Sequence, residues 1–307
     1  MLMVFSPYSF LFFSTYILFL FSLFSVNNFY FYWAIMELMM LLFMGLSYTL
    51  FVSSYSQLMI YFLIQTLSSF LILVFYVYSL PLLLTMAFFM KLSMFPFFMW
   101  YINLVYKFPN FVFWLASTLH KIPAMLMIKF FKLPAMLMIK LFSLPLHPPL
   151  LWLSILCSVL LSGLMMLSIM DLRMLLVLSS IGNNAWFLLS QMTNIFIFLL
   201  FIFFYSTSLF LSLNAFNSLS KPNISLSFSS SPYVLSLWVM SLSGMPPFPL
   251  FYSKMLIIFS LTQTLDLNYL FSMFLVFNSL MMMGYLQSLM KYFMYIYSSN
   301  VHYILKY

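Results

Sequence analysis

The stretch MKLSMFPFFMW, residues 90–100, decides the fold, because it sets a lysine and a proline deep inside an apolar run. The run begins at Pro81, so Lys91 lies ~15 Å into it at the ~1.5 Å rise of a helical residue. This depth is the middle of a bilayer, where an ammonium is costly unless it faces water or a carboxylate. Pro96 lacks a backbone donor and breaks the helix nearby. A cation beside a broken helix indicates an ion path.

The composition is that of an integral membrane protein. Of the 307 residues, 66% are hydrophobic and 5% are charged, whereas about a quarter are charged in a soluble domain. The net charge of +8 comes from lysines that are isolated or lie in short loops. Nucleic-acid binding uses a clustered basic face instead. The sequence therefore predicts a lipid bilayer as partner and excludes nucleic acid.

Motifs for a cofactor or a metal are absent from the sequence. Cys157 is the single cysteine, so it can neither hold an iron–sulfur cluster nor form an internal disulfide. There is no Walker loop, dinucleotide glycine pattern, HExxH or CxxC. The first apolar run is long enough to span a membrane, and we expect it to be retained rather than cleaved as a signal peptide. We expect no cofactor on this chain, and any redox chemistry belongs to partners.

Ten apolar segments can be drawn along the chain. They are 5–26, 29–52, 57–78, 81–106, 111–142, 150–170, 174–189, 195–216, 233–261 and 267–291. They predict an all-α polytopic membrane protein with about ten transmembrane helices in a single membrane domain, residues 1–307.

The ten segments divide into two halves of five, residues 5–142 and 150–291. An odd number of crossings per half makes the two halves opposite in orientation. The fourth segment of each half contains prolines, Pro96 in one and Pro246 and Pro247 in the other. Interrupted helices at matching positions are typical of inverted-repeat transporters and point to their binding site. We therefore predict two inverted five-helix repeats with helices four and nine broken.

Charged residues predict the orientation of the chain. With ten crossings, most loop cations fall on one face, namely Lys107, Arg173, Lys221, Lys291 and Lys306. The positive-inside rule then places both termini on the matrix or cytoplasmic side.

The fifth segment contains a tandem duplication. Residues 121–131 read KIPAMLMIKFF and residues 132–142 read KLPAMLMIKLF. A continuous helix over both copies would exceed the ~30 Å hydrocarbon thickness by roughly half. We expect one copy to protrude, to tilt or to kink at Pro134, with a second possible bend at Pro123.

Four ionisable residues lie inside apolar segments: Glu37, Lys91, Lys121 and Lys254. We interpret them as a chain of mid-membrane proton carriers in which Glu37 is the counter-ion of Lys91. The alternative is a set of lysines that snorkel to the interface, together with a structural ion pair. The depth of Glu37 and Lys91 favours function, because buried membrane charges are otherwise rare.

Two further residues are secondary candidates for the proton path. His120 precedes Lys121 and could extend a water wire, although a lone histidine is more often a packed polar residue. Lys132 opens the second copy of the duplication, and an interfacial place is the alternative for it.

Several stretches resemble one known family. MKLSMFPFFMW is similar to the segment MKLGMAPFHFW of NADH dehydrogenase subunit 2, an antiporter-like, mitochondrially encoded subunit of respiratory complex I. Further segments of this family are matched in the same order by WAIMELMML around Glu37, DLRMLLVLSSIGNNAWFL (171–188) and SLSGMPPFPLFYSKMLII (241–258). A weaker resemblance is that of LASTLHKIPAMLM. Phe98 departs from the family, which usually has histidine there, and proline follows Lys121 by two residues instead of three.

The resemblance implies a function and a location. By resemblance, Glu37, Lys91, Lys121 and Lys254 form this subunit's part of a hydrated axis that couples electron transfer to proton translocation in the mitochondrial inner membrane. The enzyme would be the whole NADH:ubiquinone reductase, with NADH, FMN, iron–sulfur clusters and ubiquinone on partner subunits. The alternatives are a free-standing cation/proton antiporter of the same fold and a non-conducting structural membrane subunit.

Overall fold

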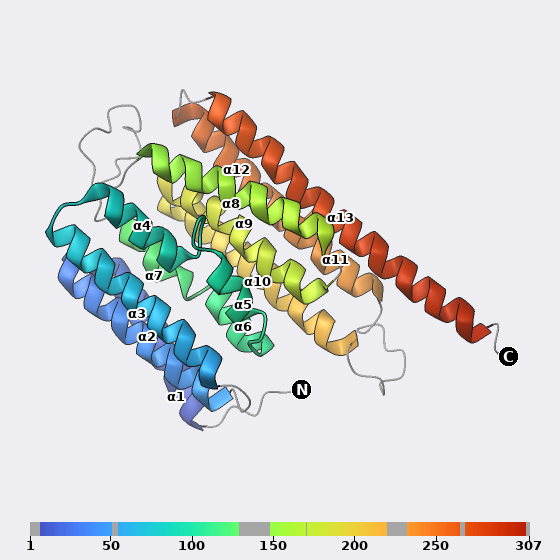
Figure 1. Cartoon of the computed structure of the whole chain (residues 1–307), viewed down its shortest axis with the longest axis horizontal. Coiled ribbons are helices and arrows are strands. Elements are labelled where there is room, and N and C mark those ends of the chain that lie inside the picture. The colour runs from blue at the N-terminus through green and yellow to red at the C-terminus, as the bar shows by residue number, and fades with distance from the viewer. Residues whose placement is uncertain are drawn as a thin grey trace. The chain divides into compact units, whose positions relative to one another are not determined.

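The computed structural model describes residues 7–50, 55–128, 148–169, 171–219, 232–264 and 268–304, and every regular element in these ranges is a helix (Figure 1). Seven of these helices are long and apolar enough to cross a membrane. A span of about 20 residues covers the ~30 Å hydrocarbon core. The prediction of an all-α polytopic membrane protein is confirmed.

The chain divides into two compact units, residues 1–155 and 156–307. The first unit opens with three long helices, α1 (Pro7–Ser25), α2 (Phe29–Leu50) and α3 (Tyr55–Val77). Two interrupted pairs of short helices follow: α4 (Pro81–Leu92) with α5 (Met99–Val105), and α6 (Asn110–Ser117) with α7 (Lys121–Leu126). The placement of 5–142 and 150–291 as inverted repeats stays a prediction.

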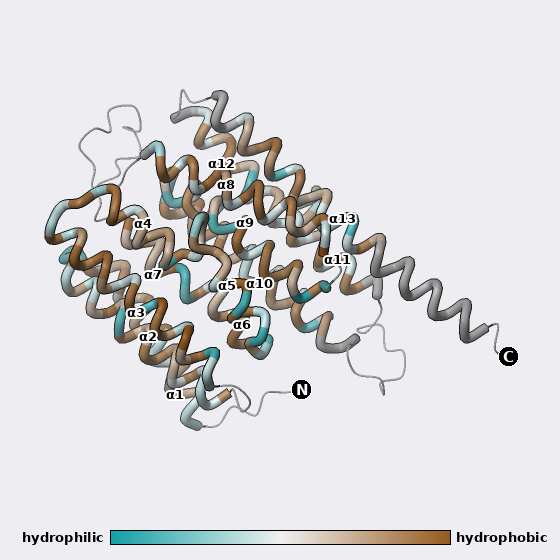
Figure 2. The backbone as a smooth tube through the Cα atoms, viewed as in Figure 1, coloured by the Kyte–Doolittle hydropathy of each residue, from teal (hydrophilic) through white to brown (hydrophobic). Residues whose placement is uncertain are grey.

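Helices of the first unit pack around an aromatic interior. α1 packs on α2, α2 on α3, and α3 on α4 and α5, while α7 contacts α1 and α4. The interior side chains include Tyr16, Tyr32, Phe43, Tyr61, Phe88 and Tyr101. The outer faces are also apolar (Figure 2), with Phe10 and Phe21 about two thirds exposed at 67% and 66%. Such surfaces suit lipid, in which the helices satisfy their own backbone hydrogen bonds.

The fourth segment is interrupted as predicted. α4 ends at Leu92, and Ser93 adopts the left-handed conformation with φ 54°. In that position its N–H lies against the carbonyls of Met90 and Phe89, which closes the helix end. The chain then passes through the cis bond before Pro96 and resumes as α5 at Met99.

The fifth segment is also interrupted, which the sequence analysis did not predict at this place. The break lies at residues 118–120, upstream of Pro123 and Pro134, where bending was expected. Thr118 ends α6 by donating from its N–H and its hydroxyl to the carbonyl of Trp114. Pro123 lies in the first turn of α7, where a missing N–H costs no helical hydrogen bond. Residues 129–147, with Lys132 and Pro134, lie outside the described residues.

In the described residues, the second unit combines long helices with one interrupted pair of shorter ones. α8 (Pro148–Ser168) starts in the first unit's range and continues into the second, followed by α9 (Leu172–Thr193), α10 (Ile195–Leu219), α11 (Pro232–Ser243), α12 (Pro249–Thr264) and α13 (Asn268–Ile304). α9 packs against α10, α12 and α13. All of its residues from Leu175 to Ser190 are buried. Many of these residues are polar, so α9 buries a polar stretch among apolar helices.

Glycines allow α13 to approach its neighbours closely. A Cβ on Gly182 of α9 would collide with the side chain of Met281, and a Cβ on Gly284 would lie 2.7 Å from Met166 of α8. Small residues at helix contacts let membrane helices come together in this way.

Two features complete the second unit. The ninth predicted segment is broken as expected, because α11 ends at Ser243, Gly244 has φ 77°, and α12 begins after the cis bond between Pro246 and Pro247. The tenth segment was expected to end at Lys291, but α13 continues to Ile304. No proline or glycine lies between these two positions to stop the helix.

Candidate functional site

Glu37 and Lys91 come together in the interior of the first unit. Lys91 lies in the last turn of α4, and its Nζ is 3.9 Å from Oε1 of Glu37 on α2. The side chain of Lys91 is 6% exposed and that of Glu37 is 23% exposed. The separation exceeds hydrogen-bond distance, and Oε1 of Glu37 has no hydrogen-bond partner among the described residues. The two groups therefore form a loose ion pair that a small motion can tighten or open.

The backbone at the break is held from α3. Nε2 of Gln65, which is 4% exposed, donates to the carbonyl oxygen of Lys91 at 3.2 Å. The last carbonyls of a helix have no partner within it. Gln65 supplies that partner, so the helix end that carries Lys91 is tied to a continuous neighbouring helix.

Lys121 is the first residue of α7 and is 6% exposed. Its Nζ lies over the ring of Tyr101 on α5, 4.7 Å from the centroid, within cation–π range. The hydroxyl of Tyr32 on α2 donates to the carbonyl of Pro123 at 2.6 Å. These contacts place the lysine between the two interrupted helix pairs and fix the start of its helix.

His120 lies at the break before Lys121, among aromatic rings from three helices. Its ring stacks on Phe43 of α2 with centroids 4.7 Å apart and lies 5.9 Å from the ring of Tyr61 on α3. Its Nδ1 is 3.5 Å from the hydroxyl of Tyr16 on α1. The first unit thus pairs Glu37 with Lys91, and α7, which begins at Lys121, packs against α4, which carries Lys91.

Lys254 lies in the second unit, on α12 beyond the break, and is 6% exposed. Its Nζ donates to the carbonyl of Ser243 at 3.3 Å and lies 5.3 Å from the ring centroid of Trp186 on α9. The indole N–H of Trp186 donates to Oδ1 of Asn278 on α13 at 3.0 Å. A Cβ on Gly244 would lie 3.1 Å from Nζ of the lysine. The broken helix therefore contacts the ammonium directly through its backbone.

Sequence reasoning missed the residues that contact these lysines and the histidine. Gln65 was not singled out, although a polar residue within an apolar helix is a usable signal. Trp186 was not singled out either, because tryptophan is common at packed positions in a chain with 22% aromatic residues. Tyr16 and Tyr101 carried no such signal, because the chain has 21 tyrosines. Lys132 lies outside the described residues, so its proposed role stays a prediction.

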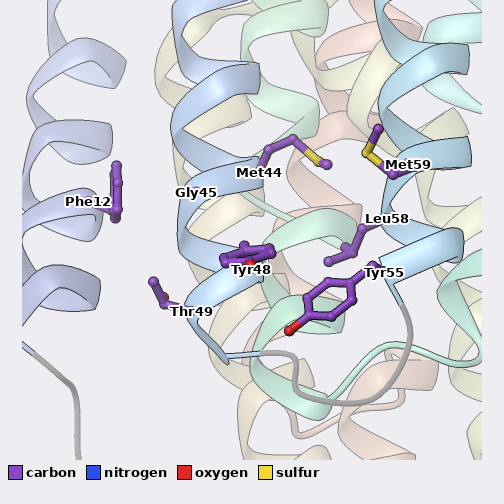
Figure 3. A pocket seen from close by; sticks show the side chains of 8 residues that line it. All are labelled: Phe12, Met44, Gly45, Tyr48, Thr49, Tyr55, Leu58 and Met59. Carbon is purple, nitrogen blue, oxygen red and sulfur yellow. The ribbon is translucent and has the colours of Figure 1, made fainter.

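An apolar cavity of about 380 Å³ opens between α1, α2 and α3 (Figure 3). Tyr48 and Tyr55 lie next to each other there with ring centroids 5.0 Å apart. The other lining residues are Phe12, Met44, Gly45, Thr49, Leu58 and Met59. None of the predicted proton carriers lines the cavity. In the described ranges, no group of three or more His, Cys, Asp or Glu side chains is placed to hold a metal.

The fold and the buried charges define a class: polytopic helical membrane proteins with interrupted helices that carry lysines inside the membrane. A model of the family described as "NADH:quinone oxidoreductase/Mrp antiporter, TM" matches residues 76–282. The chain belongs to this family.

The chain is similar in sequence to curated relatives and in fold to a chain of a solved structure. NADH-ubiquinone oxidoreductase chain 2 of Sibirionetta formosa is 31% identical over 188 residues, and that of Coturnix japonica is 30% identical. Each match covers 59% of this chain and 51% of the relative, so the chain spans about half the length of the curated relatives it matches. A chain of respiratory complex I from Thermus thermophilus with bound Aureothin shares the fold, with a TM-score of 0.59, 20% identity, and coverage of 94% of this chain and 78% of that one.

Proposed function

We propose that this chain is a proton-translocating membrane subunit of respiratory complex I in the mitochondrial inner membrane. Three findings support the proposal: the family, the name shared by the relatives, and the fold shared with a chain of a bacterial complex I. On this proposal the other membrane and accessory subunits are the partners of the chain. NADH, FMN, iron–sulfur clusters and ubiquinone are held by those partners, and both termini lie on the matrix side.

The observation that carries the proposal is the pair of Glu37 and Lys91 at the end of α4. The Nζ–Oε1 distance of 3.9 Å leaves no direct hydrogen bond, so the ammonium is stabilised mainly by the nearby charge. Separation of the two groups would remove that stabilisation and favour release of a proton from Lys91. Closer approach of the two groups would favour uptake of a proton by Lys91. A pair with two such states is suited to a switch driven by conformational change elsewhere in a complex.

Further carriers accept the proton from this switch. Lys121 begins α7, which packs against the helix of Lys91, and His120 lies just before it in the break between α6 and α7. Lys254 supplies a corresponding group in the second unit, against the backbone of the second broken helix. Each lysine can bind and release a proton, and the aromatic and backbone contacts hold it away from lipid.

A free-standing cation/proton antiporter is the second candidate, because the description of the matching family includes Mrp antiporters. Purification from native membranes separates the two functions. Co-purification with quinone reductase activity that depends on NADH supports the complex I subunit. Isolation of the chain alone with cation-driven proton exchange supports the antiporter.

Proton pumping by the intact complex tests the proposed function. We expect Lys91→Met to lower NADH-driven proton uptake per NADH oxidised while the complex still assembles. Lys107→Met is the matched control, since this lysine is exposed in the loop between α5 and α6. An unchanged proton yield in an assembled Lys91→Met complex would instead support a structural membrane subunit that conducts no protons.

A further inference from the structure

Asn183 is a buried amide that nothing in the proposed function uses. It lies in the middle of α9 and is 0% exposed. Neither its Nδ2 nor its Oδ1 has a hydrogen-bond partner among the described residues. Buried side-chain polar groups are nearly always paired, either with protein or with ordered water. Because both its donor and its acceptor are available, the Asn183 amide can bind a small polar molecule through two hydrogen bonds.

The position of Asn183 relates it to Lys254. Asn183 precedes Trp186 by three residues on α9, and residues with this spacing are neighbours on one side of a helix. The ring of Trp186 lies 5.3 Å from Nζ of Lys254. The indole N–H of Trp186 is already donated to Asn278. The amide of Asn183 thus lies about one helical turn from the indole ring that contacts the ammonium of Lys254, and both of its polar atoms are available for hydrogen bonds.

Buried serines continue this side of α9 in both directions. Ser179 is four residues before Asn183 and Ser190 is seven residues after it, and both are 0% exposed. Their hydroxyls donate to the carbonyls of Leu176 and Phe187 on their own helix. Each hydroxyl oxygen keeps acceptor capacity when its proton is used in this way. Polar side chains therefore recur along the side of α9 whose Trp186 contacts Lys254.

We propose that the amide of Asn183 binds a buried water molecule that forms part of the proton route to and from Lys254. Oδ1 accepts a hydrogen bond from this water and Nδ2 donates one to it, which orients the water along α9. The lysine ammonium transfers one N–H proton to the water oxygen, and the water releases one of its own protons to the next water or hydroxyl. Asn183 is a positioning residue, because its amide carries no proton itself.

The inference rests on the proposed function, and two variants measured beside Lys254→Met keep the two separable. In native membranes we expect Asn183→Leu to lower NADH-driven proton translocation by about tenfold or more, because the route loses the water that relays the proton. Asn183→Ser should keep most of the rate, because a hydroxyl can hold a water in the space that the shorter side chain leaves. If Lys254→Met lowers translocation and Asn183→Leu does not, the inference is overturned and the proposed function stands. If neither variant lowers it, both fail.

If Asn183→Leu prevents assembly of the complex, a second measurement tests whether the Asn183 amide binds water. A density map of the wild-type complex at a resolution that shows ordered water examines the site without any variant. We expect water density within hydrogen-bond distance of the Asn183 amide. A dry amide, or an amide paired with a side chain of another subunit, overturns the inference.

Discussion

Gln65 on α3 donates a hydrogen bond to the main-chain carbonyl of Lys91, 3.2 Å away, at the residue before α4 ends. The bond links a continuous membrane helix to an interrupted one at the position of a buried charge. The carbonyl that it satisfies has lost its helical partner because the chain turns at Ser93. The broken helix is therefore a defined structure, and its lysine is held in place through the backbone.

Replacement of Gln65 tests this link. Gln65→Leu leaves the buried carbonyl of Lys91 without a donor, and we expect a loss of about 1–3 kcal/mol of stability. The midpoint for thermal loss of this chain from the complex measures the effect. Thr66→Val serves as the control, because the Thr66 hydroxyl donates to carbonyls of its own helix, those of Phe62 and Leu63. Equal midpoints for the two variants would show that the Gln65 bond adds nothing.

The contact between Tyr16 and His120 gives a second prediction. Tyr16→Phe removes the hydroxyl that faces Nδ1 of the imidazole at 3.5 Å and leaves the packed ring in place. We expect a loss of about 0.5–1.5 kcal/mol, the usual net value of such a bond. Tyr8→Phe on the same helix, at a side chain that is 73% exposed, should change nothing. A thermal midpoint for Tyr16→Phe equal to that of the wild type would count against the contact.

Gly244 is predicted to tolerate no side chain. Gly244→Ala puts a Cβ on a residue with φ 77° and 3.1 Å from Cδ and Nζ of Lys254. We expect a cost of about 1–3 kcal/mol from the backbone alone and a lower rate of proton translocation, because the ammonium is displaced. In the control Ser243→Ala, the carbonyl that accepts from Lys254 remains. A translocation rate for Gly244→Ala as high as that of the control would refute the steric argument.

Trp186 is predicted to stabilise the second unit through two partners. Trp186→Phe loses the indole N–H bond to Asn278 and weakens the attraction for Lys254, since tryptophan is the best cation–π partner. We expect a combined loss of about 1–3 kcal/mol. A double-mutant cycle with Asn278→Ala isolates the hydrogen bond, and its coupling should be about 1 kcal/mol. A coupling near zero would mean that the indole bond contributes nothing.

Much of this fold was predictable from the sequence, because hydropathy locates membrane helices and proline locates their breaks. The interruptions at Pro96 and Pro247 followed directly from this reasoning. The break before Lys121 did not, since Pro123 was interpreted as a bend within a helix although proline also suits a first helical turn. The end of the last helix was missed because its apolar span stops well before the helix does.

Part of the candidate site was predictable as well. Glu37 is the one carboxylate inside an apolar segment, which made it the natural counter-ion for a buried lysine. The contacts of Lys121 with Tyr101 and of Lys254 with Trp186 join different helices. In a sequence with 22% aromatic residues, no spacing rule selects these two rings. Such contacts depend on tertiary packing, which residue patterns do not contain.

The most direct test of the account is a double-mutant cycle on Glu37 and Lys91 with proton translocation per NADH oxidised as the measured quantity. Glu37→Gln and Lys91→Met each remove one charge of the pair and nearly conserve side-chain size. If the two residues act as one switch, each single variant lowers the proton yield and the double variant lowers it no further than the worse single one. A proton yield equal to that of the wild type in all three assembled variants would contradict the account.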